Sequence, residues 1–142
     1  MPGKDRSLPD TNTVIRYLLK DVPEQFAESE PYFEAVRSGQ QKALLLESVL
    51  VECIYVLTKH YLVPKDEVVD VLSGLLRYKG FINSDKTALL EALALFKAES
   101  IDVVDCVLIA TARHNNMAVF SFDKKLKKLF EQDARLPSGK ES

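Results

Sequence analysis

Short apolar runs that alternate with amphipathic segments constrain the fold of this chain more than any other sequence feature. Ala43–Leu46 is apolar throughout, and Met117–Phe122 (MAVFSF) is the best strand candidate in the chain. A short, fully apolar run is typical of a strand buried on both faces of a parallel sheet. Because each parallel crossover needs a covering helix, the alternation predicts an α/β fold, a three-layer α/β/α sandwich around a short parallel sheet.

Two weaker strand candidates and a series of helices complete this pattern. Residues 6–10 form a short candidate in which a proline removes one backbone donor, and residues 81–82 form another. Thr11 or Asn12 is expected to cap the first helix, and Asp102 to cap a later one. Helices are expected at about residues 12–20, 24–36, 47–61, 64–79, 86–98, 103–114 and 124–130.

The length and composition indicate one globular domain. The 142 residues fit a single core, since a chain of about 150 residues buries roughly 68–70% of its surface on folding. Hydrophobic residues make up 46% and charged residues 28%, which excludes the composition of a disordered protein. We expect a domain at residues 1–132 and a flexible C-terminal tail at residues 133–142.

Charge and cysteine usage exclude several classes of protein. The chain has 19 Lys and Arg against 21 Asp and Glu, and its net charge of −2 indicates neither a strongly basic nucleic-acid binder nor an acidic tail. Cys53 and Cys106 lie far apart without a C-x-x-C pattern, which favours a reducing cytoplasm. The N-terminus lacks a signal-peptide pattern, and no apolar run approaches the ~18–20 residues that cross a bilayer. We therefore expect a cytoplasmic protein with no membrane segment.

Four acidic residues stand where a ligand site is expected. Asp10 ends the first strand candidate and Asp123 ends the last, whereas Glu52 and Asp105 lie within mainly apolar helical segments. Ligands of parallel α/β sheets bind at the carboxyl ends of the strands. A carboxylate in apolar surroundings is unfavourable unless it is paired, hydrogen-bonded or bound to a cation. Each acid alone has a simple explanation as a helix cap, a solvated group or an ion-pair partner, but together they predict one shared site.

Four carboxylates at one site would require a compensating group. Like charges repel, so such a cluster is stable only with raised pKa values or a bound cation. Oxygen ligands suit Mg²⁺ or Mn²⁺ better than zinc. Mg²⁺ held by carboxylates polarises a phosphoryl oxygen and lowers the pKa of bound water, which suits the hydrolysis of phosphodiesters. The four side chains should then converge around one cation-sized space.

Four segments also resemble a known family. They match, in order, the four acidic motifs of PIN-domain ribonucleases, and in particular those of the VapC-type toxins of bacterial toxin–antitoxin pairs: PDTNTVIRYLL, ESVLVECIYVLTKHY, SIDVVDCVLIATA and VFSFDKKLKKL. The resemblance extends from about residue 7 to residue 130. The first strand of the family is usually an apolar run, whereas here Arg6 and Pro9 interrupt it, so we expect a short first strand.

The resemblance implies a PIN-like fold and a metal-dependent endoribonuclease. It assigns the catalytic and metal-binding acids, position by position, to Asp10, Glu52, Asp105 and Asp123. It places polar residues that support these acids at Asn12, Ser121 and Asp102, although Asp102 is also explained as a helix cap. The same resemblance implies Mg²⁺ or Mn²⁺ as cofactor, RNA as substrate, a homodimer, and a cognate antitoxin that covers the active-site groove.

Positive charge is concentrated directly after the last acid. Such a run is usually a solvated helix face, but next to a phosphodiester site some of its members would contact RNA phosphates. The candidates for RNA contact are Arg16, Arg113, Lys124 and Lys125.

Two other functions stay open at this point. The string D-T-N-T-V approaches the motif of haloacid-dehalogenase-like phosphatases, in which the first Asp is a nucleophile, but Asn12 stands where that motif has a second acid. The other alternative is a catalytically inactive PIN-like binding module, and the presence of all four acids argues against it. His60 and His114 have no zinc-ligand spacing.

Overall fold

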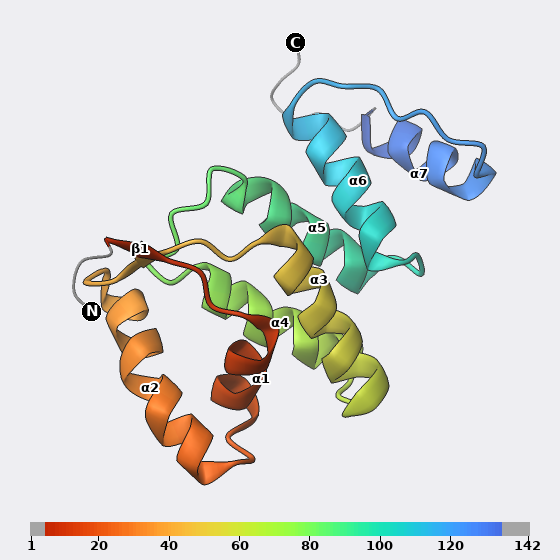
Figure 1. Ribbon diagram of the computed structural model, residues 1–142. Helices are drawn as coiled ribbons and strands as arrows, with labels where there is room; N and C mark the ends of the chain where they lie inside the picture. The colour runs from red at the N-terminus through yellow and green to blue at the C-terminus, as the bar shows by residue number, and fades with distance from the viewer. Residues whose placement is uncertain (1–4, 135–142) are drawn as a thin grey trace.

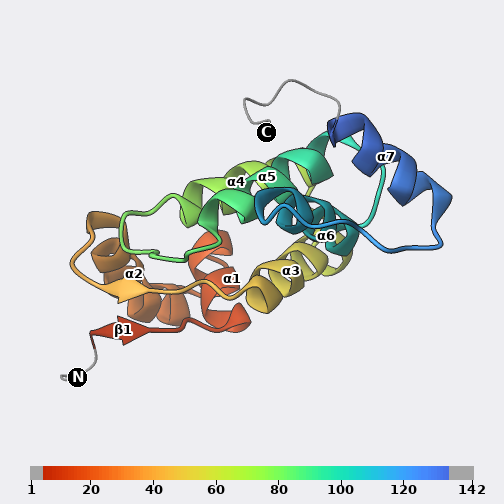
Figure 2. The same ribbon diagram turned by 90° about the horizontal axis from the view of Figure 1, so that it is seen from above.

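Helices make up most of the chain in a computed structural model, which gives residues 5–134 and their side chains as far as residue 132 (Figure 1). The same arrangement is seen from above in Figure 2. In chain order the elements are β1 (Arg6–Ser7), α1 (Thr11–Leu19), α2 (Pro23–Ser38), β2 (Lys42–Ala43), α3 (Glu47–Tyr55), the π-helical turn η1 (Val56–His60), α4 (Lys65–Leu76), α5 (Lys86–Ala98), α6 (Val103–His114) and α7 (Lys124–Ala134).

The sheet is parallel and very short. Strands β1 and β2 pair in parallel, with Arg6 opposite Lys42 and Ser7 opposite Ala43. A single parallel bridge joins Ala43 to Phe81 on the other side. The α/β class and the parallel pairing are therefore confirmed. Within the described residues the two strands have two residues each, so the sheet is consistent with a three-layer sandwich and does not by itself show one.

A side chain limits the length of this sheet. The backbone N–H of Leu45 donates to Oδ1 of Asn83 at 2.9 Å, and Nδ2 of Asn83 donates to the carbonyl of Leu45 at 2.6 Å. The Asn83 amide thus occupies the place of a peptide group on a neighbouring strand. This explains why the apolar run at 43–46 does not continue as a regular strand.

The helix ends follow local chemistry. The cap of α1 is Asp10 rather than Thr11 or Asn12, because the Asp10 side chain accepts from the backbone of Thr13. The prediction that Asp102 caps α6 is confirmed by its bond with the backbone N–H of Val104. Helix α2 ends at Gly39, whose φ of 91° lies in the left-handed region that favours glycine.

The core has one large part and smaller parts at the C-terminal end. The large part includes the fully buried side chains of Val14, Phe33, Leu45, Ile54 and Leu72, from α1 to α4. A separate cluster joins α6 to α7 through Ile109, Leu126 and Leu129. The two cysteines, Cys53 and Cys106, are both fully buried.

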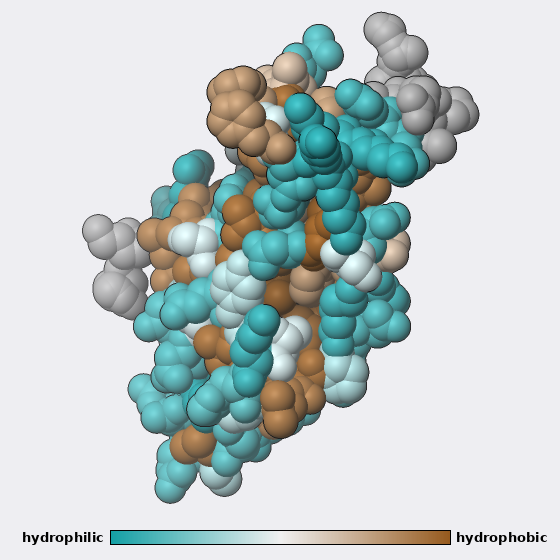
Figure 3. All heavy atoms as spheres, turned by 90° about the vertical axis from the view of Figure 1, so that its right-hand side faces the viewer, coloured by the Kyte–Doolittle hydropathy of each residue, from teal (hydrophilic) through white to brown (hydrophobic). Residues whose placement is uncertain are grey.

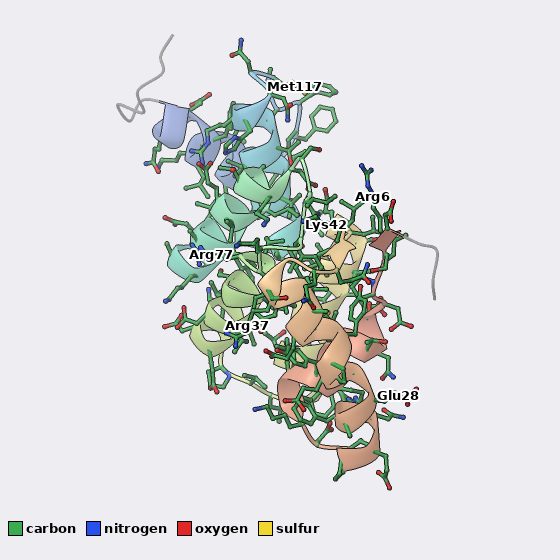
Figure 4. The ribbon with its side chains drawn as sticks, turned by 90° about the vertical axis from the view of Figure 1, so that its left-hand side faces the viewer. Arg6, Glu28, Arg37, Lys42, Arg77 and Met117 are labelled. Atoms are coloured by element: carbon green, nitrogen blue, oxygen red, sulfur yellow. The ribbon has the colours of Figure 1, made fainter. Side chains whose placement is uncertain are left out.

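The predicted strand at Met117–Phe122 is wrong. The segment is not a strand, and Phe120 and Phe122 are 90% and 88% exposed. Leu126 and Leu129 of α7 pack on Ile109 of α6, and Val119 of the connecting segment packs against this cluster. Figure 4 shows Met117 at the upper end of the molecule, well away from Arg6 on β1.

Two further expectations concern the ends and the membrane. Helix α7 continues to Ala134, so the boundary of the tail predicted at 133–142 lies too early, and residues 135–142 lie outside the described part of the chain. No helix within residues 5–134 has the length and apolar character needed to cross a membrane.

Candidate functional site

Asp10 stands where the first strand leads into α1. Its Oδ1 accepts hydrogen bonds from the Thr13 hydroxyl at 2.7 Å and from the Thr13 backbone N–H at 2.9 Å. The hydroxyl bond has the largest effect, and together these bonds lower the pKa of Asp10 because they stabilise its charged form. Asp10 is thus held as an exposed carboxylate beside the first turn of α1.

Glu52 is held on α3 by the residue that follows Asp10. The Thr11 hydroxyl donates to Oε1 of Glu52 at 2.8 Å. Burial raises the pKa of the Cys53 thiol to about 12, and the charges of Glu52 and Asp10 add to this shift. Asp10 and Glu52 therefore lie in one neighbourhood, and Cys53 is a protonated core thiol rather than a nucleophile.

A second hydrogen bond joins α3 to the start of α6. The Tyr55 hydroxyl donates to both carboxylate oxygens of Asp102, each at 2.9 Å. Burial raises the pKa of Tyr55, and the bond to Asp102 and the charges of Asp102 and Asp105 raise it further. Tyr55 thus keeps its proton and fixes the N-terminus of α6 against α3.

Asp105 and Asp123 are the two remaining motif acids. Burial raises the pKa of Asp105, and the negative charges of Asp102 and Asp123 raise it further. Asp123 begins α7, where its Oδ1 accepts from the backbone N–H of Leu126 at 3.0 Å. Asp105 and Asp123 are therefore near enough to repel one another.

Helix α3 organises these contacts into one acidic site, which we define by Asp10, Glu52, Asp102, Asp105 and Asp123. Glu52 and Tyr55 are three residues apart and therefore share a face of α3. Glu52 reaches the start of α1, and Tyr55 reaches the start of α6. Two hydrogen bonds thus link the first, second and third acidic motifs. Asp123 of the fourth motif lies near enough to Asp105 for its charge to raise the pKa of Asp105.

The four predicted ligands do not converge on one cation-sized space in these side-chain positions. In the described part of the chain, no three Asp, Glu, His or Cys side chains lie close enough together to hold a metal ion. Of the four, Asp10 and Asp123 each accept a hydrogen bond from a backbone N–H of the following helix, which orients one of their oxygens toward that helix. The donor set still fits a hard divalent cation, because it consists of carboxylate oxygens and because burial, followed by the negative charges of Asp102 and Asp123, raises the pKa of Asp105.

The sequence comparisons agree with this arrangement of motifs. Residues 7–131 match the PIN domain family. The chain belongs to the PIN-domain family. Over 118 residues this PIN domain is 25% identical to a VapC ribonuclease of Aquifex aeolicus (strain VF5), an alignment that covers 82% of this chain and 87% of the relative. No solved structure matches it significantly.

The polar residues predicted to support the acids of the PIN domain have different roles here. Ser121 Oγ accepts the backbone N–H of Asp123 at 2.9 Å, so it shapes the turn before α7. Asn12 is exposed on α1 and lines a cavity beside α2, and it has no hydrogen bond to any of the described acids. Asp102 caps α6 and accepts from Tyr55, as described above.

Several residues predicted to contact RNA form hydrogen bonds or ion pairs within the PIN domain instead. Arg16 donates to Asp21 at 2.8 Å and to the Tyr61 hydroxyl at 2.7 Å. Arg113 lies 3.9 Å from Glu91, which also contacts His114. Lys125 donates to the carbonyl of Ser100 at 2.8 Å, whereas Lys124 is exposed beside Asp123.

Sequence reasoning missed two residues of this PIN domain, Thr13 and Tyr55. Thr13 stands three residues after the capping Asp10, the spacing of a reciprocal helix cap, and that pattern could have identified it. Tyr55 carries only a weaker signal, its spacing of three residues from Glu52 on one helix. Its partner Asp102 is distant in sequence and is known only from the fold.

Proposed function

We infer that this PIN domain is a metal-dependent endoribonuclease that hydrolyses RNA phosphodiester bonds, and that it acts as the toxin of a VapC-type toxin–antitoxin pair. One observation carries the proposal: hydrogen bonds from the first turn of α1 and from α3 gather motif acids along one face of α3 in a PIN domain. The similarity to a VapC ribonuclease supports it. The family match favours this function over a haloacid-dehalogenase-like phosphatase.

The residues that would hold the cation are Asp10, Glu52, Asp105 and Asp123. Mg²⁺ or Mn²⁺, when bound, supplies charge for a phosphoryl oxygen and acidifies a water molecule. Burial and the negative charges of Asp102 and Asp123 raise the pKa of Asp105, and a divalent cation would favour its ionised form against both effects. Reorientation of the Asp10 and Asp123 side chains would accompany binding, since one oxygen of each is engaged as a helix cap.

Three neighbouring hydroxyl groups position the acids. Thr13 keeps Asp10 ionised, Thr11 fixes the rotamer of Glu52, and Tyr55 fixes the entry to α6. Partners of this kind orient ligands and are expected to influence activity about 10–100-fold. Lys124, which is exposed and next to Asp123, is the best placed of the predicted cations for an RNA phosphate.

The test compares two glutamates on α3. Full-length protein free of any partner is incubated with total RNA and Mg²⁺ or Mn²⁺, with EDTA as the metal-free condition. Glu52→Gln should lower cleavage at least about 100-fold, the upper range for a partner of a metal ligand. Glu47→Gln, at the exposed start of the same helix, should stay within about twofold of wild type. Asp105→Ala should behave like Glu52→Gln.

Two results would contradict the proposal. Cleavage that persists in EDTA would contradict the proposed metal dependence. Equal activity of the two glutamate variants would contradict the proposed site. Wild-type protein that cleaves no RNA would instead support a catalytically inactive binding module.

The protein partners are part of the same proposal. Phe120 and Phe122 are almost fully exposed, and their rings contact edge to face with 5.6 Å between the ring centroids. Figure 3 shows apolar surface projecting at the end of the molecule that carries α6 and α7. Exposed apolar groups of this size usually mark a protein-binding surface, which supports a homodimer and a cognate antitoxin in the cytoplasm. Ultracentrifugation of the chain alone and with its antitoxin would measure both assemblies.

A further inference from the structure

A cavity of about 280 Å³ lies between α1 and α2, next to the acidic site. Its walls are formed by Asn12, Thr13, Arg16, Gln25, Glu28 and Ser29. Thr13 also donates both of its hydrogen bonds to Asp10. The cavity and the Asp10 carboxylate are therefore separated by a single side chain.

The charges in this cavity disfavour a phosphate group. The guanidinium of Arg16 is engaged by Asp21 and by Tyr61, so its positive charge is already compensated. Glu28 on α2 has no ion pair or hydrogen bond with any of the described residues, and it leaves a carboxylate at the wall. Figure 4 shows Glu28 at the lower end of the molecule, far from Met117. An occupant should thus be uncharged and should donate hydrogen bonds to a carboxylate.

The polar groups of the cavity match the edge of a nucleobase. Asn12 and Gln25 each present an amide, which both donates and accepts, and each is exposed. Amide and carboxylate side chains read base edges, with carboxylates accepting from amino groups. The volume is slightly below the range of about 300–1,000 Å³ for pockets of drug-sized ligands, which suits a single base.

We propose that this cavity is a base-recognition subsite for one unpaired nucleotide of the RNA substrate. It selects a base with an exocyclic amino group facing Glu28, which means guanine, adenine or cytosine rather than uracil. Uracil has no amino group: its one donor on that edge, N3–H, lies between two carbonyl oxygens that would face the carboxylate and repel it. The subsite rests on the proposed nuclease function and deepens it, since it would set which position of an RNA is cut.

Sequencing of cleavage ends from a randomised RNA pool tests this selection. Wild-type protein should disfavour uracil about tenfold at one position near the cut. Glu28→Ala should reduce that preference to about twofold or less. Glu30→Ala is the matched control, because Glu30 is an exposed glutamate of α2 outside the cavity.

A binding measurement separates the subsite from catalysis. Fluorescence anisotropy in EDTA compares a labelled eight-nucleotide uridine oligomer with oligomers that carry one central guanine, adenine or cytosine. Wild-type protein should bind at least one substituted oligomer about tenfold more tightly, and Glu28→Ala should bind all of them alike.

The two arms distinguish failure of the subsite from failure of the nuclease. RNA cleavage with the same base profile in wild type and Glu28→Ala overturns the subsite and leaves the nuclease. Selective binding without any cleavage supports the subsite and contradicts the nuclease. Neither cleavage nor selective binding overturns both.

Discussion

At the scale of single residues, the two oxygens of Asp10 have different surroundings. Oδ1 is committed to the Thr13 hydroxyl and backbone, whereas Oδ2 has no hydrogen bond to any of the described residues. A side chain with this division can cap a helix and keep a charged oxygen available to a ligand at the same time. The helix cap and the proposed metal ligand are therefore compatible roles for one residue.

Replacement of Thr13 by valine tests this division. Thr13→Val removes the hydroxyl donor but keeps the backbone N–H and the side-chain shape. The pKa of Asp10 should rise toward its ordinary value, because the lost bond is the largest cause of its lowering. Carbon-detected NMR titration of the carboxyl group measures the change. Thr13→Ser retains the hydroxyl and should leave the pKa of Asp10 low. Equal Asp10 pKa values in the two variants would contradict the role of the hydroxyl in lowering it.

Asp105→Asn is expected to stabilise the fold in the absence of divalent cations. The pKa of Asp105 is raised, so the folded chain holds this proton more tightly than the unfolded chain does. Stability therefore falls as the pH rises through the folded-state pKa, and the ionised group is unfavourable at pH 7. Thermal melts in EDTA should show a higher melting temperature for Asp105→Asn at pH 7 and a smaller difference near pH 4. Glu30→Gln, at an exposed position of α2, should show no such pH dependence.

At the scale of elements, the prediction and the structure differ most in the segment between α6 and α7, which was predicted as a strand and is not one. Phe120→Ala should change the free energy of unfolding by less than about 0.5 kcal/mol, because its ring is 90% exposed. Phe33→Ala should cost about 3–5 kcal/mol, because its ring is fully buried in the core. Urea denaturation measures both. A Phe120 variant as destabilised as the Phe33 variant would mean that this segment is a buried strand after all.

Elements whose partners are local could be predicted from the sequence. The apolar spacing of residues 48–61 predicted a mainly buried helix face with Val49, Leu50, Cys53, Ile54, Val56, Leu57 and Tyr61. Leu50, Cys53, Ile54 and Leu57 are buried, Val49 and Val56 are half-buried, and Tyr61 is exposed. Apolar content alone could not place residues 117–122, because it does not say which surface covers them. The packing of Leu126 and Leu129 on Ile109 decides that path, and it depends on the orientation of two helices.

The same distinction applies to the candidate site. The motifs located the acids Asp10, Glu52, Asp105 and Asp123 along the chain. Their separation and their hydrogen-bond partners depend on rotamers and on contacts between distant elements, such as Tyr55 with Asp102. These are set by the packing of α3 against its neighbours and have no local sequence pattern.

At the scale of the whole molecule, the proposed ligands belong to the beginning, middle and end of the chain. A cation bound to all of them would connect α1, α3, α6 and α7. Saturating Mn²⁺ should raise the melting temperature by about 5–10 °C, since a ligand at 100 times its dissociation constant contributes about 2.7 kcal/mol. EDTA should reverse the effect, and Asp105→Ala should abolish it. An equal shift in that variant would place the cation elsewhere.

The amide of Asn83 takes the place of a strand beside Leu45, so deamidation of this one side chain would affect the stability of the fold. Deamidation to aspartate would replace a donor by a carboxylate oxygen that faces the Leu45 carbonyl. Asn83→Asp imitates this change and should cost about 1–3 kcal/mol, the usual loss when a buried partner goes unsatisfied, while Asn116→Asp at an exposed turn serves as the control in urea denaturation. Old preparations of the protein would then lose stability through spontaneous hydrolysis, without any change in the gene.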